Sequence, residues 1–110
     1  MSLSLVYMTA GSPEEADVLA RMLVERRLAA CANVIDGMRS VYWWEGTIEE
    51  GREAMLVAKT RTDLVDELTR AVKAIHSYEV PCVVAVPLEG GNPDFLNWIY
   101  DETKRPKRGD

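Results

Sequence analysis

The segment His76-Ser77-Tyr78-Glu79-Val80-Pro81 places several side chains capable of chemistry next to one another. It holds the only histidine of the chain, followed by a phenol and a carboxylate. Pro81 stops a preceding helix from continuing through the segment. An imidazole beside a carboxylate can bind a transition metal or transfer a proton near neutral pH. The same histidine could instead satisfy the carbonyl groups at a helix end, and from this segment alone that structural role is the more common one.

The two cysteines, Cys31 and Cys82, do not form a CxxC motif, so the sequence predicts neither a zinc ribbon nor a redox pair. A free cysteine is commonly a small buried side chain. A thiolate and an imidazole together favour Cu(I), Cu(II) or Zn(II), but a closed zinc site needs four ligands. We therefore expect no tight metal site within one chain, and the sequence leaves open a site shared across subunits or a weak exposed one using His76 and Glu79. A nucleophilic pair of Cys31 and His76 lacks a recognisable third group, and an enzyme is not expected.

Three consecutive aromatic residues, Tyr42, Trp43 and Trp44, must point to both faces of any strand that contains them. At least one is expected to be exposed in a monomer, which predicts a subunit contact, with a platform for stacking a ligand as the second possibility. Lys59 could offer a cation to an anionic ligand, although a lysine that reaches solvent is the ordinary case. A group of acidic residues is interpreted as a solvated hairpin tip: Glu45, Glu49, Glu50 and Glu53.

The composition is that of one globular domain spanning residues 1–110. Apolar residues make up 47% of the chain and charged residues 28%, which excludes a disordered protein. The net charge of −5 argues against nucleic acid as a partner. The first residues lack the pattern of a secretory signal, and no apolar run is long enough to cross a membrane. A cytoplasmic protein with reduced thiols is expected.

The first half of the chain predicts a strand, a helix and a long hairpin. Leu3 to Thr9 is a short β-favouring run, and a helix capped by Ser12, with Glu15 completing a capping box, is expected to reach about Arg27. The hairpin pairs a strand over 30–44, interrupted at Gly37 by a bulge, with a strand over 47–60. This hairpin is longer than so small a domain needs, so its tip should be covered by a neighbouring subunit.

The second half predicts a helix, a strand and a final helix. Thr62 is expected to cap a helix that ends before Pro81. The nearly all-apolar run from Cys82 to Leu88 predicts a central strand covered on both faces. A short last helix begins at Asn92-Pro93-Asp94. The β-α-β-β-α-β order with a terminal helix indicates an α+β, ferredoxin-like sandwich.

Several motifs, taken together and in this order, resemble the CutA family of divalent-ion tolerance proteins. They are Glu25–Val34, Ser40–Gly46, Lys59-Thr60, His76–Pro81 and Leu96–Ile99. The family pattern usually reads His-Pro-Tyr-Glu, and here Ser77 takes the place of the proline. The resemblance implies a tight trimer, similar to that of the PII signalling proteins, in which the long hairpins pair between subunits. It also implies a role in the tolerance of copper and other divalent cations, with metal binding at His76 and Cys31.

Two functional hypotheses follow. The first is a non-enzymatic, cytoplasmic homotrimer that acts in the response to metal ions, requires no cofactor and binds Cu(II) or another divalent transition metal with modest affinity. The alternative is a PII-like sensor or adaptor that holds a small anionic ligand in clefts between subunits. The wall residues expected for that cleft are Asn33, Lys59, Tyr78 and Trp98.

Overall fold

The chain alternates strands and helices in the order predicted from the sequence. The structure is a computed structural model, and it describes residues 2–105. Its elements are β1 (Leu3–Ala10), α1 (Pro13–Glu25), β2 (Cys31–Trp44), β3 (Thr47–Arg61), a 3-10 turn η1 (Thr62–Leu64), α2 (Val65–Ile75), β4 (Val83–Pro87) and α3 (Pro93–Glu102). Helix α1 ends before the predicted Arg27, because that residue adopts a left-handed backbone conformation with φ of 57°.

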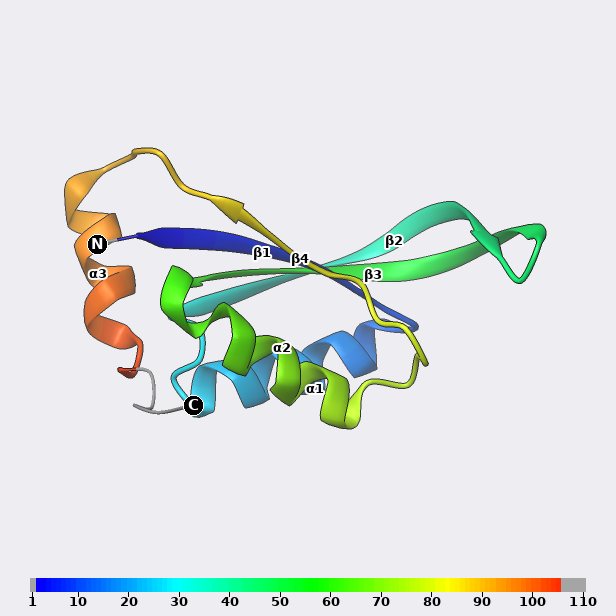
Figure 1. The fold of residues 1–110 in the computed structure, drawn as a ribbon, viewed down its shortest axis with the longest axis horizontal. Coiled ribbons are helices and arrows are strands. Elements are labelled where there is room, and N and C mark those ends of the chain that lie inside the picture. The colour runs from blue at the N-terminus through cyan, green and yellow to red at the C-terminus, as the bar shows by residue number, and fades with distance from the viewer. Residues whose placement is uncertain (1, 106–110) are drawn as a thin grey trace.

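The four strands form one antiparallel sheet in the order β2-β3-β1-β4, which is the ferredoxin-like arrangement expected from the sequence. Helices α1 and α2 lie on one face of this sheet, and α3 lies across the end at which β1 begins (Figure 1). The opposite face carries no helix among the described residues. We refer to it as the helix-free face.

The core lies between the sheet and the first two helices. Alternate residues of β1 and β3 point into it, as the two-residue period of a strand requires. Its largest fully buried side chains include Val6 and Met8 of β1, Leu56 of β3, Leu19 and Leu23 of α1, and Leu68 and Val72 of α2. Full burial of one such side chain stabilises the fold by about 1.5–3 kcal/mol. A smaller cluster of Leu3, Ala30 and Ile99 attaches α3 to the sheet.

Strand β4 is an edge strand, and the prediction of a central, doubly covered strand over 82–88 is wrong. Among the strands of residues 2–105, its only neighbour in the sheet is β1. Val83 packs against the core, whereas Val84 is 53% exposed and Val86 48% exposed. The apolar run therefore contains side chains of both kinds: Val83 faces the helices, whereas Val84 and Val86 are exposed on the helix-free face.

The predicted bulge in the long hairpin is confirmed at Gly37. The β2–β3 register shifts between Ile35 and Met38, and Gly37 has φ of 82°. At the hairpin turn, Glu45 and Gly46 both have positive φ, the geometry that a two-residue hairpin loop requires. The hairpin extends well beyond the helices (Figure 1).

The start of the second helix differs from the prediction. Thr62 opens the 3-10 turn and makes no capping bond to the helix. Its hydroxyl is instead 2.7 Å from that of Ser4, so it ties the end of β3 to β1. Within residues 2–105, no helix has the length and apolar character needed to cross a membrane.

Candidate functional site

His76 is the first residue after α2, and its side chain is completely buried. Its Nδ1 accepts a hydrogen bond from the backbone N–H of Tyr78 at 3.0 Å. Nε2 lies 2.8 Å from the carbonyl oxygen of Thr9, which can only accept, so Nε2 carries the proton and donates it. Both ring nitrogens are therefore engaged inside the chain, and the neutral tautomer is fixed by its partners. The ring also lies 4.8 Å, centroid to centroid, from that of Tyr78.

Glu15 connects the start of α1 to the residues after α2. Ser12 caps α1 as predicted, by accepting the N–H of Glu15 at 3.1 Å. The Glu15 carboxylate accepts the N–H of Gly11 at 2.9 Å, rather than that of Ser12 as in a capping box. It also accepts the N–H of Ser77 at 2.7 Å and the Ser77 hydroxyl at 2.9 Å.

We call the hydrogen bonds of the Glu15 carboxylate with Gly11 and Ser77 the Glu15 clasp. This clasp holds the carboxylate in its charged form. Burial opposes its ionisation, but the N–H groups of Gly11 and Ser77 and the Ser77 hydroxyl together lower the pKa of Glu15. Its Oε2 also lies 3.7 Å from His76 Nδ1. The clasp thus fixes the backbone on either side of the buried imidazole, and a charged carboxylate stays beside the ring.

Tyr78 points toward the long hairpin and donates its phenolic hydrogen to Glu53 Oε2 at 2.8 Å. Burial, followed by the hydrogen bond and the negative charge of Glu53, raises the pKa of Tyr78. The interpretation of Glu53 as part of a solvated hairpin tip is therefore wrong. The bulge at Gly37 shortens β3 relative to β2 at this point and places Glu53 opposite Met38, close to the main body of the domain.

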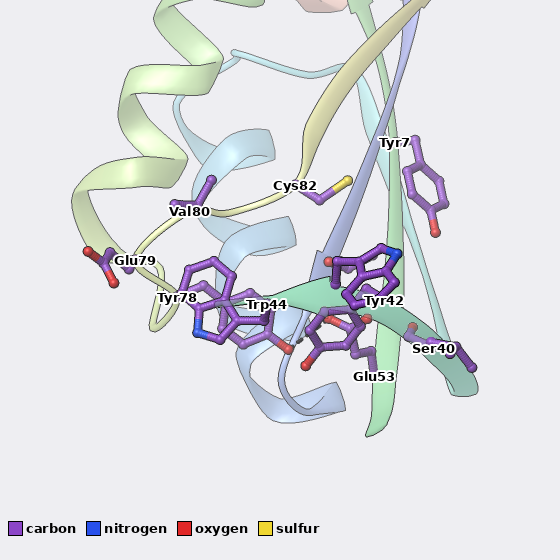
Figure 2. Close-up of a pocket in the computed structure, with 12 residues that line it drawn as sticks. Tyr7, Ser40, Tyr42, Trp44, Glu53, Tyr78, Glu79, Val80 and Cys82 are labelled. Atoms are coloured by element: carbon purple, nitrogen blue, oxygen red, sulfur yellow. Dashed lines mark hydrogen bonds between the residues drawn. The ribbon is translucent and has the colours of Figure 1, made fainter. Parts of the chain in front are cut away.

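An open pocket of about 590 Å³ lies over this pair, between the hairpin and the loop that precedes β4 (Figure 2). Tyr7 and Thr9 of β1 contribute to its wall, as do Cys82 and the segment Tyr78–Val80. The remaining lining residues are Ser40, Val41, Tyr42, Trp43, Trp44 and Glu53 of the hairpin. Sequence reasoning missed Tyr7, Glu53 and Cys82, because their convergence depends on strand pairing between distant segments.

A second polar cluster lies on the helix-free face where β2 begins. Cys31 pairs with Lys59 across the sheet, and Lys59 Nζ is 3.7 Å from Cys31 Sγ. The same ammonium donates to Asn33 Oδ1 at 2.8 Å. Two of the four predicted cleft residues, Asn33 and Lys59, are thus in contact, while Tyr78 and Trp98 lie near opposite ends of the sheet (Figure 1). The four do not line one cleft within a single chain.

The predicted metal ligands are also apart within one chain. His76 is bonded to Thr9, which pairs with Met55, whereas Cys31 pairs with Lys59 four residues farther along β3. That offset alone is roughly 13 Å along the strand. The ammonium beside Cys31 also disfavours a cation there. Glu79 is exposed, and residues 2–105 contain no group of three or more His, Cys, Asp or Glu side chains arranged for a metal ion. The residues of one chain therefore do not fit a metal bound within it.

The aromatic residues expected at a subunit contact are exposed. Tyr42 is 47% exposed, Trp43 71% and Trp44 38%. At the other end of the sheet, α3 presents Phe95 and Trp98, whose rings lie 5.4 Å apart and which are also exposed. The subunit contact itself stays a prediction.

The model of the CutA1 divalent ion tolerance protein family matches residues 4–102. The Divalent-cation tolerance protein CutA of Archaeoglobus fulgidus is 46% identical over 100 residues, which cover 91% of this chain and 96% of that protein. A rice protein, Protein CutA 1, chloroplastic, is 44% identical over 91% of this chain. The chain spans only 56% of the length of that plant relative.

Solved structures agree with the sequence comparisons. The crystal structure of CutA1 from Oryza sativa superposes with a TM-score of 0.93 at 42% identity, covering 96% of this chain and 97% of that one. The divalent cation tolerance protein from Thermus thermophilus gives a TM-score of 0.91 at 41% identity, covering 93% of this chain and 99% of that one. A structure from Archaeoglobus fulgidus is described as periplasmic, with a TM-score of 0.89, 42% identity and coverage of 93% of this chain and 99% of that one.

Proposed function

The chain belongs to the CutA1 divalent ion tolerance protein family, and from this premise we propose that it acts in the response to divalent metal ions as a non-enzymatic homotrimer in the cytoplasm. One observation carries the proposal: a protein named for divalent-cation tolerance matches this chain at 46% identity over 96% of its own length. The cytoplasmic location is part of this proposal. Relatives named as chloroplastic and periplasmic make it a point to test by fractionation.

Two unlike surfaces support a closed ring of subunits. The sheet has free edges at β2 and β4, and free edges favour pairing with another chain. The exposed aromatic residues of the hairpin and those of α3 lie toward opposite ends of the molecule (Figure 1). A contact between unlike patches is heterologous, and it closes into a ring when the rotation between subunits permits. The trimer is the ring that the family resemblance implies.

Direct binding of Cu(II) is proposed to be modest. A metal ion that takes Nδ1 of His76 must displace the N–H of Tyr78, and one that takes Nε2 must displace the carbonyl of Thr9. The lost hydrogen bond and the opening of a buried ring reduce the net affinity. Glu79 lies three positions after His76 and is exposed, so it can take part in such a site. Cys31 belongs to the site only if a neighbouring subunit supplies it.

Calorimetric titration with Cu(II) tests this site, with the mass measured by light scattering. Wild type is compared with His76→Ala, Glu79→Gln and Cys31→Ser. We expect saturable binding with a whole number of Cu(II) ions per subunit. This binding should be lost in His76→Ala and weakened in the other two variants. Glu79→Gln alters an exposed side chain, so it reports on the site without the loss of a buried ring. Identical heats in all four proteins would remove His76, Glu79 and Cys31 from metal binding.

The oligomeric state is tested separately with Trp43→Glu. Trp43 is the most exposed of the three hairpin aromatics, so a charge there leaves the core of one subunit intact. We expect the mass to fall from trimer to monomer while the helical circular dichroism is retained. The matched control is Val18→Glu on the outer side of α1, which is 60% exposed and should leave the trimer unchanged. A wild-type monomer would refute the assembly.

A further inference from the structure

Two arginine side chains stand opposite each other on the long hairpin. Arg39 of β2 pairs with Arg52 of β3, so both side chains leave the same face of the ribbon, with Cβ atoms about 4.5–5.5 Å apart. Both residues are exposed, and neither forms an ion pair within residues 2–105, even with Glu50 on the same face. Like charges in directly opposite positions destabilise a pair of strands. An anionic partner from outside the subunit would relieve this repulsion.

The same face of the hairpin carries exposed apolar side chains. At alternate positions after Arg39 come Val41 and Trp43, and Ile48 lies opposite Trp43 on β3. All three apolar side chains are exposed. Tryptophan and arginine are enriched among the residues that dominate the affinity of protein contacts. We call Arg39, Val41, Trp43, Ile48 and Arg52 the hairpin patch.

Helix α3 combines exposed aromatic side chains with the opposite charge. Asp94, Trp98 and Asp101 follow one another at spacings of four and three residues, which places them along one side of the helix. The ring of Phe95 lies 5.4 Å from that of Trp98, centroid to centroid. Both aspartates are exposed, and neither forms an ion pair among the residues that the structure describes. We call these four residues the α3 patch.

We propose that the hairpin patch of one subunit docks on the α3 patch of the next, with Arg39 and Arg52 paired to Asp94 and Asp101. This contact presupposes the homotrimer proposed above and assigns the charges that set its register. The two patches lie toward opposite ends of the molecule, as a head-to-tail contact requires (Figure 1). The aspartates are about 10 Å apart along the helix axis, a separation that two long arginine side chains can span by spreading apart.

The charges also select the direction in which subunits meet. A contact between two hairpin patches would place arginines against arginines, and a contact between two α3 patches would place aspartates against aspartates. Juxtaposed like charges cost free energy and suppress the wrong pairing. Only the contact between unlike patches satisfies both charge pairs, so the arrangement favours a head-to-tail ring over a two-fold dimer.

Subunit exchange measures this contact however tightly the trimer is held. The full chain is prepared with and without nitrogen-15, the two populations are mixed, and native mass spectrometry follows the formation of mixed trimers. The hairpin variant carries Arg39→Glu and Arg52→Glu, and the helix variant carries Asp94→Lys and Asp101→Lys. We expect each variant to exchange at least about 10-fold faster than wild type. The combined variant, with all four substitutions, restores opposite charges at every contact of the ring and should exchange within about 3-fold of wild type.

The combined variant separates a lost contact from a folding defect, because a misfolded hairpin or helix is not repaired by substitutions in the other patch. Salt gives a second readout: added sodium chloride should accelerate exchange in wild type and slow it in the hairpin variant, since it screens attraction and repulsion alike. The matched control reverses two exposed cations of α2, Arg70→Glu with Lys73→Glu, and should exchange as wild type does.

If the helix variant does not fold, Asp101→Lys alone takes its place, because a cation in the last turn of a helix is favourable. It is then also the variant that is combined with the hairpin substitutions. Reversals that exchange like wild type, or a combined variant that exchanges as fast as the hairpin variant, would overturn the pairing while the trimer itself stands. A wild-type monomer would refute the proposed assembly and this contact together.

Discussion

Glu15 and Ser77 are joined by two hydrogen bonds, although they lie 62 positions apart in the sequence. One bond uses the backbone N–H of Ser77 and the other its hydroxyl. The family pattern usually has proline at this position, and proline can supply neither donor. The serine of this chain therefore adds a connection between α1 and the loop after α2 that a proline would remove. The two donors can be separated by mutation.

Ser77→Ala removes the hydroxyl bond only, and Ser77→Pro removes both. His76 has ψ of 142°, which is compatible with a following proline. We expect Ser77→Ala to lower the free energy of unfolding by about 0.5–1.5 kcal/mol. Ser77→Pro should lower it by about 1–2 kcal/mol, after the gain of about 0.4–1 kcal/mol from a less flexible unfolded chain. Urea denaturation measures both. A proline variant as stable as wild type would show that the N–H bond contributes little.

The clasp predicts how stability depends on pH in the acid range. The pKa of Glu15 in the folded protein lies below its ordinary value of 4.5, so the folded state binds this proton more weakly than the unfolded state. The carboxylate therefore stabilises the fold above pH 4.5, and this contribution is lost as the pH falls through the lower, folded value. Glu15→Gln should be destabilised at pH 7, and its difference from wild type should shrink toward acid pH. The neighbouring variant Glu14→Gln is the control, and a constant difference for Glu15→Gln would contradict the assignment.

The tautomer of His76 can be observed directly. Because Nδ1 accepts from Tyr78 and Nε2 donates to Thr9, long-range proton–nitrogen NMR spectra should show an unprotonated Nδ1 and a protonated Nε2 at neutral pH. His76 is the only histidine, so the signal needs no assignment. We expect slow exchange of the Nε2 proton with solvent, because the side chain is fully buried. The opposite tautomer, or a freely exchanging ring, would mean that His76 is available to ligands without rearrangement.

The two thiols should react at different rates. Burial, followed by the charge of Glu53, raises the pKa of Cys82, and its thiolate is correspondingly scarce near pH 8. We expect iodoacetamide to modify Cys31 faster than Cys82, as measured by mass spectrometry of peptides. Glu53→Gln should accelerate the modification of Cys82 and leave that of Cys31 unchanged. If the rate at Cys82 does not respond, the field of Glu53 does not extend across the pocket.

The bulge at Gly37 is tested with a pair of glycine variants. Gly37 and Gly51 both have space for a methyl group, with no atom within 4 Å of an added Cβ, but only Gly37 has a positive φ. Gly37→Ala should therefore lower the free energy of unfolding by about 1–2 kcal/mol through backbone strain alone. Gly51→Ala should be neutral or slightly stabilising. Equal effects in thermal unfolding would mean that the bulge relaxes without cost.

Local patterns in the sequence predict most of the fold. The strand and helix periods, the Ser12 cap and the irregularity at Gly37 each depend on nearby residues, and each is confirmed. The position of β4 was predicted wrongly, because an apolar run does not reveal whether a helix, a subunit or solvent faces it. Thr62 likewise resembles a helix cap, but its hydroxyl forms a hydrogen bond with the hydroxyl of Ser4 on β1 instead.

The site is less predictable than the fold, because its contacts connect distant segments. The buried His76 ring is hydrogen-bonded to the carbonyl of Thr9, which lies 67 positions earlier in the sequence. Glu53 looks like its acidic neighbours on the hairpin, and only the register beyond the bulge and the approach of Tyr78 distinguish it. A sequence pattern identifies the groups that can do chemistry, whereas the pairing of strands decides which of them meet.

The central position of β1 has a consequence for the synthesis of the chain. Leu5 of this first strand pairs with Lys59 on one side and with Val86 on the other, so both partners are made much later. At about 5–20 residues per second, a ribosome exposes β1 for several seconds before either neighbour exists. During this time helix α1 can cover the face of β1 that carries Val6 and Met8. It cannot form hydrogen bonds with the backbone N–H and C=O groups along the two edges of the strand. The nascent protein is therefore most vulnerable to aggregation while its hairpin is still unfinished. The sheet is complete only when β4, its last strand, leaves the ribosome.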